Sequence, residues 1–181
     1  GWCVERTKEW IMVSNTNSPY PSQGWKLHVS AGLSSAETIL RRVIPVLYRE
    51  GVSFKLTSNT KKLRYLNYGH GGISQIGKFI TIYPTTDAQA VHLAPLLAEA
   101  TQGLPGPRIP SDHPLASDGV VFYRYGGFIG KLAYVNSGTK VGYTIRSPDG
   151  SLVMDKRHKS YQKFDWVNDP FIAAGIASDS L

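Results

Sequence analysis

The chain has 181 residues, of which 41% are hydrophobic and 18% are charged, and its formal net charge is +7. This composition is typical of one globular domain with a buried core, and it excludes a membrane-spanning helix because no run of about 18 apolar residues occurs. Cys3 is the only cysteine, so an intrachain disulfide and a cysteine-based zinc site are excluded. Since the N-terminal segment is charged and lacks the apolar stretch of a signal peptide, we expect a cytoplasmic protein.

The positive charge is concentrated in one part of the chain. Residues 24–83 contain nine Lys or Arg, two Glu and no Asp, so this part alone carries nine minus two, or +7. A concentrated basic region favours an anionic partner such as nucleic acid, phospholipid or a phosphorylated substrate. Charge alone leaves an ordinary solvated surface equally open.

The first predicted elements are a strand and a helix. Residues Trp25–Ser30, WKLHVS, alternate strictly between apolar and polar side chains, as in a half-buried strand. The following apolar stripe predicts a helix that begins with a capping box of Ser34 and Glu37 and ends before Gly51. Pro45 lies inside this helix and should kink it or mark a short break.

Two more strands and two more helices are predicted in the middle of the chain. Val52–Thr57 alternates again, and Lys78–Pro84 is rich in β-branched and aromatic residues, so both are expected to be strands. A short helix is expected around Lys61–Asn67, and a longer amphipathic helix over Thr86–Gln102, closed by Gly103.

The second half of the chain is predicted to be mostly loops and strands, followed by a tail. A Pro-rich loop precedes the strand Val120–Gly127, and Lys131–Val135 with Val141–Arg146 forms a hairpin across Ser137–Gly138. A short strand follows the turn at 148–150. We divide the chain into a domain of residues 1–160 and an irregular linker or tail of residues 161–181. This order of elements predicts an α+β fold, with helices packed against a mixed, largely antiparallel sheet.

One segment resembles a nucleotide-binding loop. Gly72, Gly77 and Lys78 fit the G-x-x-x-x-G-K part of a P-loop, but Phe79 stands where a magnesium-binding Ser or Thr is required. The segment also leads into a predicted strand, whereas a P-loop opens a helix. We therefore interpret it as a turn that feeds a strand.

Basic side chains recur on several predicted strands. Lys26 and His28 point to the same side of their strand, and further cations stand on or beside other strands at Lys55, Lys78 and Arg124. Like charges placed across a sheet repel one another, so their gathering predicts a site for a multiply charged anion such as phosphate. A histidine among them could donate a proton.

Several phrases of the sequence resemble a known family. GWKLHVS, GVSFK, GKFITIYP, LPGPRIPSD, VFYRYGGF and DWVNDPF occur in this order between about Trp2 and Phe171. Together they resemble the N-terminal lyase domain of class III lanthipeptide synthetases, with class IV enzymes close behind. That domain is in turn similar to the phosphothreonine lyases that bacterial pathogens inject, which implies a phosphothreonine-lyase-like fold.

The resemblance implies a role for each residue that matches the family pattern. Lys55 would be the general base and His28 the general acid. The substrate phosphate would be bound by Lys26, Arg124 and, as a softer match, Lys131. Tyr83 and Asp112 would be supporting residues. Where the effector lyases carry an arginine before the third strand, this chain has Ile73, and Lys78 would supply the charge.

The implied reaction is β-elimination of phosphate from phosphoserine or phosphothreonine in a precursor peptide, with no metal or organic cofactor. Its partners would be that peptide and the kinase and cyclase domains of one full-length synthetase, with no nucleic acid and no membrane. Two alternatives stay open. The basic segment with its aromatic residues would suit a single-stranded nucleic-acid-binding module, and the same pocket without turnover would make a phosphopeptide-recognition domain.

Overall fold

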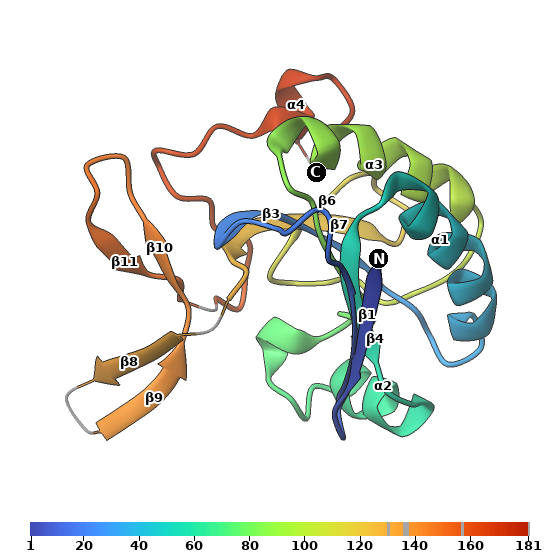
Figure 1. Cartoon of the computed structure of the whole chain (residues 1–181). Coiled ribbons are helices and arrows are strands. Elements are labelled where there is room, and N and C mark those ends of the chain that lie inside the picture. The colour runs from blue at the N-terminus through green and yellow to red at the C-terminus, as the bar shows by residue number, and fades with distance from the viewer. Residues whose placement is uncertain (130, 136–137, 157, 181) are drawn as a thin grey trace.

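The computed structural model describes residues 1–129, 131–135, 138–156 and 158–180. Its centre is a seven-stranded sheet in the order β1-β2-β4-β5-β3-β7-β6 (Figure 1). Every strand pairing within the described residues is antiparallel, so the α+β class is confirmed and the expected mixture of directions is replaced by one antiparallel sheet. The sheet strands are β1 (Trp2–Arg6), β2 (Trp10–Asn15), β3 (Gln23–Val29), β4 (Ser53–Thr57), β5 (Ile80–Tyr83), β6 (His113–Pro114) and β7 (Val121–Gly127).

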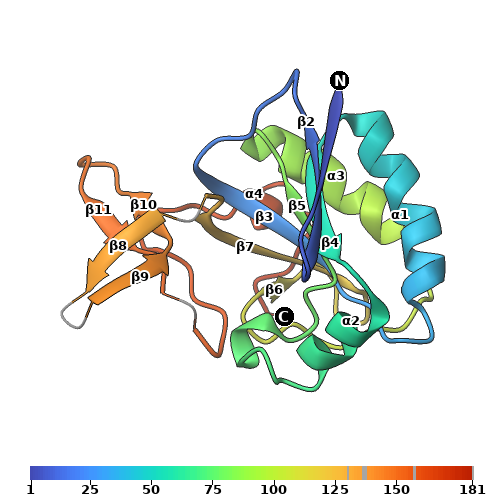
Figure 2. The same cartoon turned by 60° about the horizontal axis from the view of Figure 1, so that its bottom comes forward.

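Two long helices cover one face of this sheet. Helices α1 (Ala36–Glu50) and α3 (Asp87–Ala100) pack on each other, and α3 packs on β3 and β7 (Figure 2). The apolar stripe of α1 is buried, as the helical spacing of Ile39, Val43 and Leu47 predicts. The shorter α2 (Thr60–Asn67) follows β4. Helix burial therefore leaves the opposite sheet face available for polar side chains.

The alternation along β3 and β4 divides these strands between the two faces. Trp25, Leu27 and Val29 belong to the hydrophobic core together with Phe54 of β4. Because successive side chains of a strand point to opposite faces, Lys26, His28 and Lys55 lie on the other side. The predicted strands at these positions are confirmed.

The ends of the helices follow the sequence signals only in part. Gly51 ends α1 with a left-handed backbone (φ 68°), as predicted. The Thr86 side chain caps α3 by accepting a hydrogen bond from the Gln89 N–H. The predicted capping box of Ser34 is wrong. The residue before α1 is Ser35. Its hydroxyl donates a hydrogen bond to the carbonyl oxygen of Pro105 (2.6 Å), and its side chain does not cap the helix. The helix continues through Pro45 without a break.

Strands β1 and β2 were not predicted. They form an antiparallel hairpin whose second strand pairs with β4. All five residues of β1 are exposed, so this edge strand lacks the alternation of apolar and polar residues that signals a half-buried strand.

Two small hairpins project from the side of the sheet (Figure 1). The first pairs β8 (Lys131–Val135) with β9 (Gly138–Gly142), and the second pairs β10 (Thr144–Arg146) with β11 (Leu152–Met154). A hairpin of Lys131–Val135 with Val141–Arg146 was predicted, but β8 pairs with β9, and Tyr143 separates β9 from β10. The short strand predicted after the turn at 148–150 is β11, and its pairing with β10 was not predicted. Tyr143 lies close to β7, because its Cβ is 3.1 Å from where a Cβ on Gly127 would stand.

The last part of the chain packs against the rest of the domain. The expectation that residues 161–181 form an irregular tail is therefore wrong for the segment around α4. Helix α4 (Pro170–Ala173) is capped by Asp169, and Phe171 is fully buried. The Phe171 ring stacks on Tyr123 with 4.0 Å between ring centroids, and the Tyr123 hydroxyl donates to the Asp169 carboxylate. Whether a domain boundary lies after residue 160 stays a prediction.

Candidate functional site

The polar face of the sheet brings together side chains from four neighbouring strands. In the strand register, Thr81 of β5 lies opposite Lys55 of β4 on one side and opposite His28 of β3 on the other. Two residues before His28 on β3, and therefore on the same face, Lys26 lies opposite Arg124 of β7. Residues opposite each other in antiparallel strands share a face. The register therefore places Lys55 and His28 in one row, two strands apart, with Thr81 between them.

His28 is held by a buried carboxylate. Its Nδ1 makes a short hydrogen bond with Asp112 Oδ2, and Ser111 Oγ donates to the other carboxylate oxygen (3.0 Å). Both side chains of the pair are almost completely buried. Since Nδ1 is engaged with Asp112, Nε2 is the ring nitrogen left for a bound substrate.

The charges around this pair shift both pKa values. Burial lowers the pKa of His28, with Lys78 and Lys26 adding to the effect and Asp112 opposing it. Burial would raise the pKa of Asp112, but attraction to His28, Lys78 and Arg124 outweighs it and lowers that pKa. The imidazole is thus neutral without substrate and donates its Nδ1 proton to an ionised carboxylate.

Lys55 reaches the same pocket from β4. Its Nζ lies 4.3 Å from the centroid of the Trp10 ring, which is a cation–π contact. Lys55 also has electrostatic or hydrogen-bond partners beyond this ring. Trp10, Thr81 and Gln75 line the pocket beside it.

Three further cations line the same pocket as this row. Lys26, Lys78 and Arg124 all line the pocket, and Lys78 is only 8% exposed. Burial, together with repulsion from Lys78 and Arg124, lowers the pKa of Lys26 to about 7. Its Nζ donates to the carbonyl oxygen of Gly127 (3.0 Å). Ile73, by contrast, is 42% exposed and is not among the residues that line this pocket.

Arg124 is oriented by an acidic residue that the sequence reading missed. Its guanidinium forms a two-point ion pair with Asp155, and the same carboxylate accepts a hydrogen bond from the Gly127 N–H (2.9 Å). Gly126 makes room for this pair, because a Cβ there would stand 2.5 Å from Asp155 Oδ2 and 2.6 Å from Arg124 Nη1. Asp155 directly follows β11, so the ion pair also ties the second small hairpin to β7.

Aromatic side chains form one rim of the pocket. Tyr83 is buried, and its ring contacts Tyr20 and Phe128, each at 5.2 Å between centroids. Burial raises the pKa of Tyr83, so its hydroxyl stays protonated. Tyr143 completes this rim. The backbone of Lys131 begins β8, but its side chain lies outside the described part of the structure.

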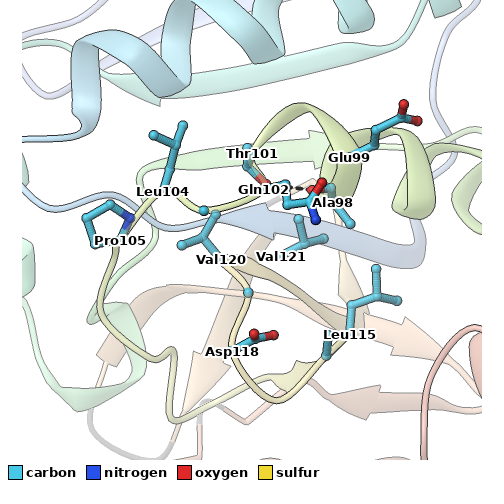
Figure 3. Close-up of a pocket in the computed structure, with 13 residues that line it drawn as sticks. Ala98, Glu99, Thr101, Gln102, Leu104, Pro105, Leu115, Asp118, Val120 and Val121 are labelled. Atoms are coloured by element: carbon cyan, nitrogen blue, oxygen red, sulfur yellow. Dashed lines mark hydrogen bonds between the residues drawn. The ribbon is translucent and has the colours of Figure 1, made fainter.

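The chemistry of the pocket and the sizes of the cavities point to different places. A cavity of about 520 Å³ lies between the end of α3 and the loop before β7 (Figure 3). Its charged lining groups are the carboxylates of Glu99 and Asp118, which would repel a phosphate. The pocket at Lys26, His28 and Lys55 has a volume of only about 40 Å³, but it carries the cations. We therefore place the candidate site in the smaller pocket.

The structure brings together seven of the residues named from the sequence, while their roles stay predictions: Lys26, His28, Lys55, Lys78, Tyr83, Asp112 and Arg124. The sequence reading missed Trp10, Thr81, Tyr143 and Asp155. Thr81 could have been found from the strand Lys78–Pro84, since it shares a face with Tyr83. Trp10 belongs to a strand without alternation, and nothing in the sequence places it near Lys55.

The described residues contain neither a candidate metal site nor a candidate membrane-spanning helix. No group of three or more His, Cys, Asp or Glu is arranged to hold a metal ion in the described ranges. No helix of the described chain is long and apolar enough to cross a membrane.

Comparison with known proteins gives a consistent set of similarities. The family described as RamC, N-terminal domain, matches residues 1–180. The chain is 35% identical over 170 residues to a protein named Probable SapB synthase from Streptomyces coelicolor, covering 94% of this chain but 18% of that protein. The chain thus spans about a fifth of the length of this relative.

Solved structures show the same fold at low sequence identity. The type III effector and phosphothreonine lyase OspF of Shigella flexneri superimposes with a TM-score of 0.53 at 15% identity, covering 68% of this chain and 69% of OspF. The plasmid virulence protein SpvC of Salmonella gives a TM-score of 0.53 at 15% identity, covering 76% of this chain and 69% of SpvC. The expected phosphothreonine-lyase-like fold is confirmed.

Proposed function

The chain belongs to the RamC N-terminal domain family, and on that premise we propose that it eliminates phosphate from phosphoserine or phosphothreonine in a peptide. The observation that carries the proposal is the row of Lys55, Thr81 and His28 beside three buried or half-buried cations. A neutral amine and an imidazole on opposite sides of a phosphate site are the two proton-transfer groups that an elimination needs.

The reaction breaks two bonds of the substrate and forms one double bond. A base removes the proton from Cα, the electron pair forms the Cα–Cβ double bond, and the Cβ–O bond breaks. Phosphate leaves with all four of its oxygen atoms. The peptide keeps a dehydroalanine or dehydrobutyrine residue, and no water is consumed.

Lys55 is the proposed base. It must be neutral to take the Cα proton, and its position among Lys26, Lys78 and Arg124 favours the neutral amine, because nearby like charges disfavour an ammonium. After proton transfer Lys55 carries a positive charge, which the π face of Trp10 attracts (4.3 Å).

His28 is the proposed acid. It is neutral in the absence of substrate, because burial lowers its pKa. A bound phosphate brings up to two negative charges next to the ring, and these raise the pKa of His28 so that an imidazolium forms. Asp112 fixes Nδ1 and directs the Nε2 proton at the bridging oxygen of the leaving phosphate.

Lys26, Lys78 and Arg124 are the proposed phosphate-binding groups, with Lys131 as a further candidate. Charge-assisted hydrogen bonds from these cations would stabilise the charge that phosphate gains as the C–O bond breaks. Tyr83 and Asp112 support the site, Tyr83 by a hydroxyl that stays protonated.

The elimination is favoured over the two alternative functions. A phosphopeptide-binding module needs positive charge, but it has no use for a base and an acid in one row. A nucleic-acid-binding module would expose its cations along a groove, whereas Lys26, Lys78 and Arg124 converge in a small pocket. Binding to bulk RNA or DNA that falls steeply with salt would support the second alternative.

We further propose that the domain works within a larger lanthipeptide synthetase in the cytoplasm. Its kinase domain would make the phosphopeptide that this domain consumes, and its cyclase domain would use the dehydrated product. The length of the Streptomyces coelicolor relative leaves room for such domains. The division at residue 160 remains part of this proposal.

A peptide assay tests the proposed function. We would incubate the chain with one peptide carrying phosphoserine and one carrying phosphothreonine and follow their masses. Loss of phosphoric acid from either peptide is the expected result. Loss of the phosphoryl group alone, which leaves the original hydroxyl, would indicate a phosphatase and overturn the proposal.

A further inference from the structure

Trp10 stands over the amine that we propose as the base, although it comes from a part of the chain that no sequence pattern connects with the site. The ring centroid lies 4.3 Å from Lys55 Nζ. In the register of β2 and β4, Trp10 lies opposite Thr57, two residues beyond Lys55. Trp10 and Lys55 therefore occupy the same face of adjacent strands, and both line the pocket.

The hairpin that carries Trp10 is fastened at its turn. The Thr7 hydroxyl accepts hydrogen bonds from the backbone N–H groups of Trp10 (2.9 Å) and Glu9 (3.3 Å). The turn is also tied to the residue that follows β4, because Ser58 N–H donates to the Glu9 carbonyl (3.0 Å) and Ser58 Oγ to the Lys8 carbonyl (2.7 Å). The turn that precedes Trp10 is thus held against the end of the strand that carries Lys55.

Titratable side chains line the pocket around Lys55. Lys26 and His28 face it from β3, Tyr83 from β5, and Lys78 from the segment before β5. From α2, Lys62 Nζ lies 5.8 Å from the same tryptophan ring and pairs with Glu9 (3.6 Å). Lys26, Lys62 and Lys78 are the cations among these neighbours, and like charges disfavour an ammonium on Lys55.

We propose that Trp10 is a positioning residue that acts through Lys55 and stabilises the positive charge that Lys55 gains during proton transfer. This inference rests on the proposed function. A tryptophan face attracts an ammonium and has little attraction for a neutral amine. The ring therefore helps most when Lys55 has taken the Cα proton, and it makes Lys55 a stronger base than its cationic neighbours alone would allow.

Replacing Trp10 by leucine should change the pH profile in a characteristic way. Without the ring the pKa of Lys55 falls, so the limb of the kcat/KM profile that reports Lys55 moves to lower pH by about one unit. At the same time the plateau falls several-fold, because a weaker base removes the proton more slowly. A hairpin that was merely loosened would lower the plateau and leave the limb where it was.

The experiment compares three variants with the wild-type chain. Trp10→Phe keeps a ring and should show a smaller shift than Trp10→Leu. Trp2→Leu is the matched control, because Trp2 lies on the same hairpin but contacts Tyr48 (4.7 Å); it should leave the limb in place. In parallel, the Lys55 side-chain resonance, assigned with a Lys55→Arg variant, is titrated by NMR in each protein.

The titration separates this proposal from the proposed function. A lower Lys55 pKa in Trp10→Leu than in Trp2→Leu supports the role of Trp10 even when no peptide is eliminated. An unchanged Lys55 pKa in a folded Trp10→Leu variant overturns it, whether or not elimination occurs.

Discussion

The two faces of the central strands differ in nearly every physical respect. On β3, Trp25, Leu27 and Val29 point toward the helices and are buried in the core, while Lys26 and His28 point into the candidate site. The first set gains free energy by leaving water. Lys26 and His28 are instead buried near other cations. Burial and these like charges lower the pKa values of both side chains and do not stabilise the fold. One strand thus uses its apolar face to hold its polar face in place.

The largest expected effect comes from breaking the polar face. Lys55→Ala and His28→Ala should each lower the elimination rate by about 10²–10⁴-fold, because each removes one of the two proton-transfer groups. Both variants should still bind phosphopeptide, since the phosphate-binding cations remain. Turnover by mass spectrometry and binding by fluorescence anisotropy measure the two properties. Normal dehydration by either variant would reject its assignment.

The next largest effect comes from the opposite face. Leu27→Ala should lower the free energy of unfolding by about 2–5 kcal/mol, because it leaves a cavity beneath fully buried neighbours. Lys26→Met on the same strand is the control, and it should leave stability unchanged or raise it, since it removes one of several like charges. Urea denaturation measures both. If the lysine variant were the less stable one, the division of the strand into two faces would be wrong.

How far the sequence foretold these faces depends on the signal each element carries. Strict alternation located β3 and β4, and it put Lys26, His28 and Lys55 on polar faces. Alternation does not give the order of strands, so the row of Lys55, Thr81 and His28 needed the register of the folded sheet. The roles of these residues came from family resemblance rather than from periodicity.

The features that were missed lack a local signal. Strand β1 is exposed on all five residues, and β2 begins with a continuous apolar run instead of an alternation, so nothing in the sequence connects this hairpin with Lys55. Asp155 is distant in sequence from Arg124, and their pairing depends on the fold of the projecting hairpins. The tail looked irregular because α4 is only four residues long, although Phe171 anchors it in the core.

A smaller effect is expected from the phosphate-binding side of the polar face. Lys78→Gln should weaken phosphopeptide binding by about 1.5–3 kcal/mol, the usual contribution of a hydrogen bond to a charged group. Lys78 is a cleaner test than Arg124, because loss of Arg124 would leave Asp155 buried without its ion pair. Isothermal titration calorimetry with a peptide and its phosphorylated form gives the difference. Unchanged affinity would remove Lys78 from the site.

The smallest expected effect is a change in bound protons. The pKa of Lys26 is about 7 in the free protein, so at pH 8 the amine is mostly neutral. A bound phosphate favours the ammonium form of Lys26, so this side chain should take up close to one proton on binding at pH 8. Toward pH 6 the contribution of Lys26 should vanish, because it is already protonated there. Calorimetry in buffers of different ionisation enthalpy measures the total uptake, which also includes the proton that His28 gains, and Lys26→Met should lower this total by close to one proton at pH 8.

The central claim is that the polar face breaks a carbon–oxygen bond, and heavy-oxygen water tests it most directly. The chain is incubated with a phosphothreonine peptide in water enriched in the heavy oxygen isotope ¹⁸O. The masses of the released phosphate and of the peptide are then measured by mass spectrometry. We predict phosphate without solvent oxygen and a peptide that has lost phosphoric acid. Heavy oxygen in the phosphate, with a restored threonine hydroxyl, would show hydrolysis and contradict the assignment of Lys55 and His28.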